Sequence, residues 1–219
     1  MVKKNKTPWP TKAVMHQIYQ EKLWGGSHLD FYSGTGSHDP LIIKPYINKV
    51  TAFLKAQNSM LQVCDLGCGD FNIGKHFVNY TQQYVALDIV APLIDRNKKL
   101  YKNKKLTFDC VDIAKGALPK ADCIILRQVL QHLSNKEIDE VVKKLVNYKY
   151  IILTEHVPVS SYVPNLDMIS SQGIRLKKQS GVNLLAPPFN LKVKSEVVLH
   201  RYVLDNNKGC ILTLLYTVF

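Results

Sequence analysis

The sequence predicts an α/β fold: a wound, mostly parallel β-sheet with a helical cap before it and an antiparallel hairpin at its end. Three observations carry this prediction. An apolar run over 61–66 leads into Gly67-Cys68-Gly69, strand-like segments then alternate with helical periods as far as residue 154, and two β-rich runs close the chain. A strand that ends in a glycine turn is typical of the first unit of a wound sheet, whose ligand lies against that turn.

A helical cap is expected ahead of the sheet. Apolar residues at helical spacing predict helices over 11–23 and 41–55. Between them, the glycine-rich segment 33–38 is too flexible for a strand and is expected to form a lid loop over the glycine turn. Trp24 and Tyr32 precede that segment, and their aromatic faces suit a positively charged ligand by cation–π attraction. The favoured role of Trp24 is that of a core anchor for the first helix.

The alternating part of the chain supplies the parallel strands. They are predicted over 61–66, 83–88, 106–110, 121–126 and 150–154. Helices are predicted over 71–79, over 91–101 and after Ser134-Asn135-Lys136-Glu137, which has the pattern of a capping box. The fourth strand is almost continuously apolar, which indicates a strand covered on both faces.

A long segment then interrupts the alternation. Residues 157–195 contain four prolines and show no sustained period, and a loop of this length in a compact domain is typically functional. Beyond it, β-rich runs over 197–204 and 210–218 flank Asp205-Asn206-Asn207-Lys208-Gly209, which signals a hairpin. The predicted division of the chain is a cap with its lid over 1–57 and a sheet domain over 58–219.

Composition limits the classes of function. With 46% hydrophobic and 21% charged residues, the 219-residue chain is expected to bury one core. No apolar run reaches the roughly 18–20 residues of a membrane helix. No signal peptide is visible, so a cytoplasmic protein without a membrane partner is expected. The five cysteines include no Cys-x-x-Cys pair, which predicts reduced thiols and no metal site.

Four motifs resemble, in order, those of class I S-adenosylmethionine-dependent methyltransferases. They are Val63 to Asp70, Tyr84 to Asp88, Phe108 to Ile113 and Asp122 to Arg127, which together form a specific pattern. The resemblance covers the chain from about residue 55 onward, and the first 55 residues resemble only a bacterial subgroup of that family. It implies a Rossmann-like, seven-stranded sheet and a methyltransferase that uses S-adenosylmethionine and releases S-adenosylhomocysteine.

The resemblance also implies where the cofactor binds. Asp88, at the end of the second strand, is placed to accept hydrogen bonds from both ribose hydroxyls, and Asp112 with Ile113 corresponds to an adenine clamp. Asp65 suits the ammonium of the methionine moiety. The full set of expected cofactor contacts is Trp24, Tyr32, Asp65, Gly67, Cys68, Gly69, Asp88, Ile89, Asp112, Ile113, Arg127 and Gln128.

Other interpretations of these residues stay open. Asp88 would suit NAD equally, but Asn72 stands where the dinucleotide motif needs its third glycine. Asp70 would also place a carboxylate where a pyrophosphate lies. Asp88 has a structural alternative in capping the helix that follows, and Asp112 has one as a turn residue.

Catalytic candidates follow the fourth and fifth strands. His132 is a possible general base because imidazole titrates near neutrality, and it is equally a helix-end histidine bonded to backbone. Glu155 and His156 form a second candidate pair, although adjacent residues of an extended chain point apart. Arg127 could bind the carboxylate of the cofactor. Within the long loop, Arg175 resembles a residue of the same bacterial subgroup and suggests an acceptor pocket.

The net charge of +12 bears on the methyl acceptor. The lysines are dispersed and no arginine cluster is present, which favours solvated faces over a nucleic-acid interface. A small-molecule acceptor is therefore the first expectation, because the cap and the long loop can enclose a pocket. An RNA methyltransferase is the alternative on charge alone, and a non-catalytic S-adenosylmethionine-binding protein is the third possibility. The sequence indicates no oligomeric state.

Overall fold

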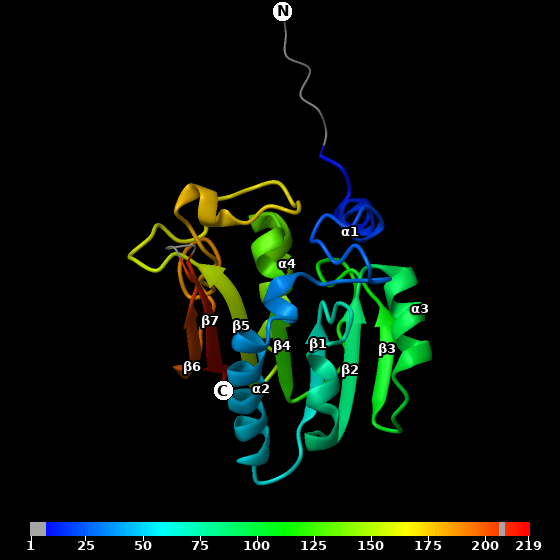
Figure 1. The fold of residues 1–219 in the computed structure, drawn as a ribbon. Coiled ribbons are helices and arrows are strands. Elements are labelled where there is room, and N and C mark those ends of the chain that lie inside the picture. The colour runs from blue at the N-terminus through cyan, green and yellow to red at the C-terminus, as the bar shows by residue number, and fades with distance from the viewer. Residues whose placement is uncertain (1–7, 206–208) are drawn as a thin grey trace, which may run out of the picture.

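A seven-stranded sheet with the strand order β3-β2-β1-β4-β5-β7-β6 forms the centre of the computed structural model, which describes residues 8–205 and 209–219 (Figure 1). The strands are β1 Gln62–Leu66, β2 Gln83–Asp88, β3 Leu106–Cys110, β4 Cys123–Arg127, β5 Tyr150–Val157, β6 Ser195–Val203 and β7 Cys210–Thr217. Strands β1 to β5 pair in parallel, whereas β7 is antiparallel to both β5 and β6. The predicted fold class is confirmed. Part of the predicted hairpin turn, residues 206–208, lies outside the described residues.

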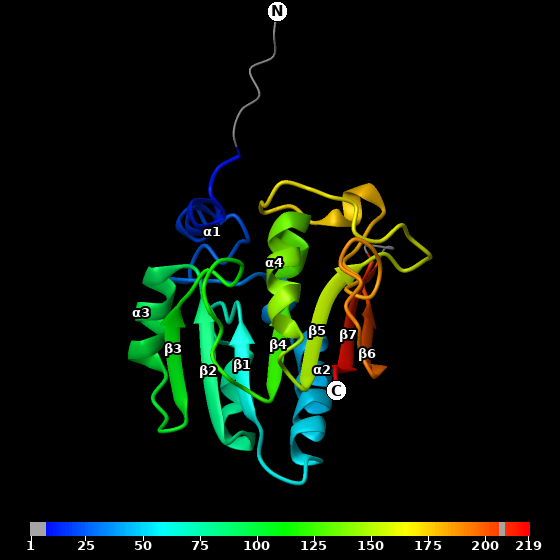
Figure 2. The same cartoon turned by 180° about the vertical axis from the view of Figure 1, so that it is seen from behind.

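Helices cover both faces of the sheet and the carboxyl ends of its parallel strands. The α-helices are α1 Thr11–Gln20, α2 Pro40–Lys55, α3 Ala91–Leu100 and α4 Asn135–Leu145. Helix α2 lies on one face and α4 on the other, while α1 lies above the carboxyl ends of the strands (Figures 1 and 2). The predicted capping box begins α4. The Ser134 hydroxyl accepts the Glu137 N–H, and the Glu137 carboxylate accepts the Ser134 N–H.

Alternating side chains of the strands build a core on each face of the sheet. In β4, Ile124 and Leu126 join the cluster that contains the buried residues of α4, whereas Ile125 joins the cluster of α2. Met15, Ile18 and Tyr19 of α1 belong to the α4 cluster, and Tyr46, Val50 and Leu54 of α2 belong to the other. The predicted segments 1–57 and 58–219 therefore share both cores.

The structure corrects the helix predicted over 71–79. The chain forms two short 3₁₀ turns there instead, η2 Gly74–His76 and η3 Val78–Tyr80. Phe71 takes a left-handed φ of 63°, and both Phe71 and Phe77 are fully buried. Residues six apart in an α-helix lie about 120° apart around its axis, so one regular helix would point the two rings in different directions.

Two other boundaries differ from their predictions. Helix α1 ends at Gln20, before the predicted Leu23, because Lys22 takes a φ of 53° and the Leu23 N–H donates to the Ile18 carbonyl at 2.9 Å. This turn takes Trp24 out of the helix. Strand β5 runs to Val157, beyond the predicted residue 154, because it pairs with β7 along its whole length.

The long segment between β5 and β6, residues 158–194, is named the late loop. Its short turn η5 Arg175–Lys178 lies over the end of α4 (Figure 1). The loop also reaches the N-terminal cap, because the Gln172 side-chain amide donates to the Leu23 carbonyl at 2.6 Å. None of the helices within the described residues is both long enough and apolar enough to cross a membrane.

Candidate functional site

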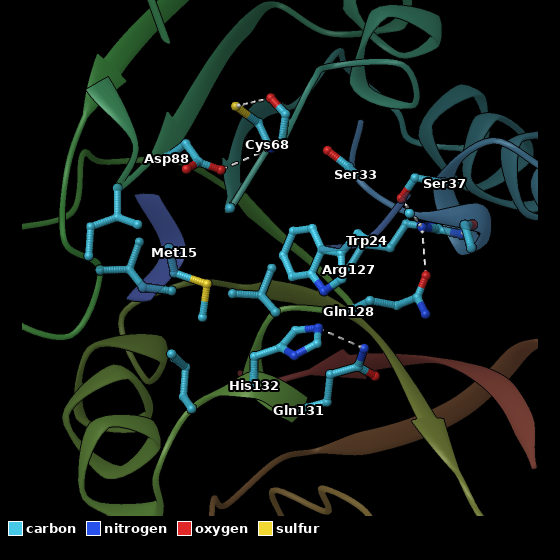
Figure 3. Close-up of a pocket in the computed structure, with 18 of the residues that line it drawn as sticks. Met15, Trp24, Ser33, Ser37, Cys68, Asp88, Arg127, Gln128, Gln131 and His132 are labelled. Carbon is cyan, nitrogen blue, oxygen red and sulfur yellow. Dashed lines mark hydrogen bonds between the residues drawn. The ribbon is translucent and has the colours of Figure 1, made fainter. Parts of the chain in front are cut away.

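A cavity of about 610 Å³ lies at the carboxyl ends of β1, β2 and β4, beneath α1 and the late loop. The predicted site residues that line it are Trp24, Asp65, Gly67, Cys68, Gly69, Asp88, Ile89, Asp112, Ile113, Arg127, Gln128 and His132. Tyr32, Glu155 and His156 are not among the described residues that line it. In the view of Figure 3, Asp88 and Cys68 lie on one side of the cavity, and Gln131 and His132 lie on the other.

The glycine turn, Gly67-Cys68-Gly69, forms part of the cavity wall. Gly67 and Gly69 have φ values of 79° and 55°, which side-chain-bearing residues rarely adopt. The Gly67 and Cys68 N–H groups each donate to the Leu87 carbonyl at 2.8 Å, which fixes the turn against the end of β2. A Cβ atom on Gly67 would lie 2.5 Å from a methyl carbon of Val129, so this position needs glycine for space as well as for conformation.

Asp88 ends β2 with its carboxylate beside the glycine turn. One oxygen accepts the Gly69 N–H and the other the Val90 N–H, both at 3.0 Å. The residue is 7% exposed, and burial raises the pKa of its carboxyl while these N–H donors oppose the rise. Each carboxylate oxygen has a second lone pair, so Asp88 can hold the start of α3 and still accept two ligand hydroxyls.

Two further carboxylates line the cavity in different surroundings. Asp65 is buried at the end of β1 and accepts the Tyr84 hydroxyl at 2.9 Å. Burial raises the pKa of Asp65 to about 7. Asp112 follows β3, and one of its oxygens accepts the Ala114 N–H at 3.0 Å, which is the predicted turn role. Asp112 also lines the cavity next to Ile113, as an adenine clamp requires.

Arg127, at the end of β4, fastens the lid loop (residues 33–38). Its guanidinium donates to the Ser37 hydroxyl at 3.0 Å and to the Gly36 carbonyl at 2.5 Å. It lies over the Tyr46 ring, 4.8 Å from the centroid. The Nε atom is buried and has no hydrogen-bond partner among the described residues. Arg127 thus lines the cavity with a guanidinium whose other two nitrogens donate the hydrogen bonds that hold the lid loop.

The lid loop is also bonded to Asp70, which follows the glycine turn. The Ser33 N–H donates to the Asp70 carboxylate at 2.9 Å, and the Asp70 N–H donates back to the Ser33 hydroxyl at 2.8 Å. His38 Nε2 lies 2.6 Å from the same carboxylate, and the Tyr32 ring packs on the His38 ring at 4.4 Å. Tyr32 therefore supports the lid loop and does not border the cavity.

His132 lies at the cavity wall within the 3₁₀ turn η4 Leu130–His132. Its Nε2 is 3.2 Å from the Gln131 side-chain nitrogen and its Nδ1 is 3.2 Å from the Gly173 carbonyl. These partners place the proton on Nδ1, because Nε2 faces an amide donor. Burial lowers the pKa of His132 to about 4, so the ring is neutral at pH 7. Since both nitrogens are engaged, a role as general base stays a prediction.

The second catalytic pair lies within β5. Glu155 is 2% exposed and accepts the N–H groups of Leu130 at 3.1 Å and Gln131 at 2.9 Å. The His156 N–H donates to the side-chain oxygen of Gln131 at 2.9 Å. Both residues thus contact η4 and do not reach the cavity wall. Their catalytic role also stays a prediction.

Sequence reasoning missed the cavity-lining face of α1. Thr11, Met15 and Tyr19 line the cavity and recur every four residues, which was the available signal. Sequence reasoning also missed Glu137, whose carboxylate accepts the hydroxyls of Thr11, Ser134 and Ser170. These donors outweigh burial and lower the pKa of Glu137. One carboxylate therefore joins α1, α4 and the late loop, an arrangement that no local motif indicates.

Comparison with known proteins gives one family model and several similar structures. Residues 64–148 match a family model described as a methyltransferase domain. The structure is similar to magnesium protoporphyrin IX methyltransferase from Synechocystis PCC 6803 with bound SAM, with a TM-score of 0.61, 16% identity and coverage of 98% of this chain and 100% of that one. It is also similar to the N-methyltransferase NodS from Bradyrhizobium japonicum WM9 in complex with S-adenosylhomocysteine, with a TM-score of 0.65, 10% identity and coverage of 93% and 98%.

A third similar structure is human N-acetylserotonin methyltransferase in complex with SAM, with a TM-score of 0.55 and 13% identity. This alignment covers 95% of the present chain and 60% of the human one. A search of curated proteins found no match. Residues 64–148 thus resemble a methyltransferase domain and the solved structures share the fold, so the predicted resemblance to the class I methyltransferases is confirmed.

Proposed function

We propose that this protein is an S-adenosylmethionine-dependent methyltransferase with a small-molecule acceptor. The observation that carries the proposal is the Asp88 carboxylate, which borders the glycine turn and the cavity in a chain with a methyltransferase domain. Its oxygens keep lone pairs for two hydroxyls of one ligand, as a ribose requires.

The remaining lining residues fit the rest of the cofactor. Asp112 and Ile113 would hold the adenine, Asp65 the ammonium, and the unpartnered Arg127 Nε–H the carboxylate. When bound, S-adenosylmethionine supplies an electrophilic methyl group for in-line displacement. The protein's own contribution is to hold and orient both reactants and to exclude water, which is a positional form of catalysis.

The enclosure of the cavity favours a small acceptor. Helix α1 and the late loop roof it, and they are tied together through Glu137 and through the bond from Gln172 to Leu23. Among the described lysines, Lys177 is the one that lines the cavity. An RNA site would need several cations at this mouth to neutralise phosphates. The net charge of +12 is the observation that supports RNA as the second candidate.

Transfer of a radiolabelled methyl group tests the proposal. The protein is incubated with methyl-labelled S-adenosylmethionine and, separately, with small-molecule, RNA and protein fractions of a cell extract. We expect label to enter the small-molecule fraction. Label in RNA would promote the second candidate. Binding of the cofactor without transfer to any fraction would indicate a non-catalytic S-adenosylmethionine-binding protein.

Cofactor affinity is expected to decrease as the pH is lowered, because Asp65 becomes protonated. With a pKa of about 7, this carboxyl is largely protonated at pH 6, whereas the ammonium of the ligand favours the ionised form. Affinity for S-adenosylhomocysteine should therefore decrease about tenfold between pH 8 and pH 6, with proton release on binding at the lower pH. Calorimetry in buffers of different ionisation enthalpy measures both quantities. In Asp65→Asn the pH dependence should disappear; if it persists, another group titrates.

The lid loop and the late loop are expected to become more protected when the site is occupied. Arg127 already bonds to Ser37 and Gly36, so a ligand on its free Nε–H would hold the lid loop more firmly. Hydrogen exchange with S-adenosylhomocysteine should slow in residues 24–40 and in part of 157–195, while β7 serves as the internal reference. Equal exchange in both states would show that these loops are permanent scaffolding.

A further inference from the structure

The turn η4 brings Gln131 and His132 to the cavity wall, and the buried carboxyl group of Glu155 lies on one side of it. Glu155 of β5 accepts the N–H groups of Leu130 and Gln131, with one carboxylate oxygen for each. The Glu155 side chain is 2% exposed, so water does not compete for these bonds. The N–H groups of the turn are thus fixed from the sheet side.

A buried cation contacts the same turn through its carbonyl groups. Arg175 of the late loop is 1% exposed, and its NH1 nitrogen donates to the carbonyls of Leu130 and Gln131 at 3.3 Å each. Its NH2 nitrogen donates to the Leu133 carbonyl at 2.8 Å. The NH2 nitrogen also donates to the side-chain oxygen of Asn135 at 2.8 Å, and Nε donates to the Leu166 carbonyl at 3.0 Å.

The two side chains match the polar groups of the turn. N–H groups point to the Glu155 carboxyl oxygens and carbonyl groups point to the Arg175 guanidinium, so both side chains favour the same orientation of the backbone. The planar fork of arginine makes this possible, since it reaches several carbonyls at fixed angles, which an ammonium cannot do. Well-packed apolar residues often stabilise a core as well as buried charges do, so stability alone does not account for this pair.

We propose that Arg175 and Glu155 are positioning residues, which clamp η4 so that Gln131 and His132 keep one orientation at the cavity wall. The Gln131 side-chain oxygen accepts the His156 N–H at 2.9 Å, and its nitrogen faces His132 Nε2 at 3.2 Å. A fixed turn therefore holds the imidazole in the tautomer with its proton on Nδ1. The inference rests on the proposed function in so far as this wall faces the methyl acceptor.

Nitrogen NMR of the histidine rings tests the clamp without any ligand. The full chain is labelled at its histidines, and the His132 signals are assigned by their loss in His132→Gln. The parent protein should show one tautomer at neutral pH. Arg175→Lys keeps the charge but loses the fork, and Glu155→Gln keeps the size but loses one acceptor, so both should show a mixture of tautomers. Lys178→Met, an exposed neighbour on η5, is the matched control and should resemble the parent.

Measurements of cofactor affinity and of methyl transfer distinguish a positioning role of Arg175 and Glu155 from a role in stability alone. Both variants should bind S-adenosylhomocysteine within about threefold of the parent, because Asp88 lies on the other side of the cavity (Figure 3). Methyl transfer to the labelled fraction should fall about 10- to 100-fold. An unchanged His132 tautomer in the folded variants would overturn the proposal, and if Arg175→Lys does not fold, Glu155→Gln decides it. A parent that binds no S-adenosylhomocysteine would refute the proposed function and leave the NMR comparison valid.

Discussion

Asp88→Ala should lose at least about 100-fold in affinity for S-adenosylhomocysteine while the chain still folds. Hydrogen bonds to a charged group contribute about 1.5–3 kcal/mol each, and the variant removes the acceptor for two ribose hydroxyls. The Gly69 and Val90 N–H groups also lose their acceptor. Gly69 borders the cavity, where water can replace it, whereas the loss at the buried Val90 lowers stability. Calorimetry gives the affinity, and thermal unfolding shows whether the fold survives.

Asp122→Ala is the matched control for this variant. Asp122 also holds a backbone group with its carboxylate, accepting the Gln62 N–H at 2.8 Å, but it does so at the opposite edge of the sheet. Its loss should lower stability less, because Asp122 is exposed and accepts a single N–H, and should leave the affinity unchanged. Equal affinity of Asp88→Ala and Asp122→Ala would refute the assignment of Asp88 to the ribose.

Gly67→Ala should have the second large effect, on both stability and ligand binding. Alanine at a φ of 79° costs about 1–2 kcal/mol in backbone energy alone. Its Cβ would also lie 2.5 Å from Val129, so the residues that lead into η4 must move. We therefore expect a clear loss in the free energy of unfolding, measured with urea, and a weaker affinity for S-adenosylhomocysteine.

Gly173→Ala provides the comparison, since Gly173 lines the same cavity. A Cβ there meets Ser171 Oγ at 3.4 Å, which is an ordinary contact distance, and its φ lies outside the left-handed region. The unfolding free energy of this variant should stay within about 1 kcal/mol of the parent. If Gly67→Ala is as stable as Gly173→Ala, the glycine turn does not need its glycine.

The sheet and the cofactor side of the cavity were predictable because their signals are local. Strands β2 and β3 begin and end at the predicted residues. Asp88 and Asp112 follow parallel strands, and the carboxyl ends of such strands meet at one edge of a sheet. The order of these motifs along the chain was therefore enough to bring them to one cavity.

The other side of the site depends on contacts between distant segments. Arg175 meets Leu133 and Glu137 meets Thr11 only because the late loop and α1 fold back over the strand ends. No spacing in the sequence encodes such a pairing. Arg175 was predicted to suggest an acceptor pocket, yet its guanidinium is bonded to the backbone of η4 and Leu133, and Arg175 is not among the described residues that line the cavity.

The missing α-helix after the glycine turn has a consequence for ligand choice. In dinucleotide-binding folds, a helix that begins at this turn presents its positive end to a diphosphate. Here η2 and η3 stand in its place, and the Asp70 carboxylate lies at the turn. The protein therefore lacks the macrodipole that would compensate a polyanion. A ligand with no net negative charge does not need that compensation, so we expect the turn to favour such a ligand over nicotinamide dinucleotides.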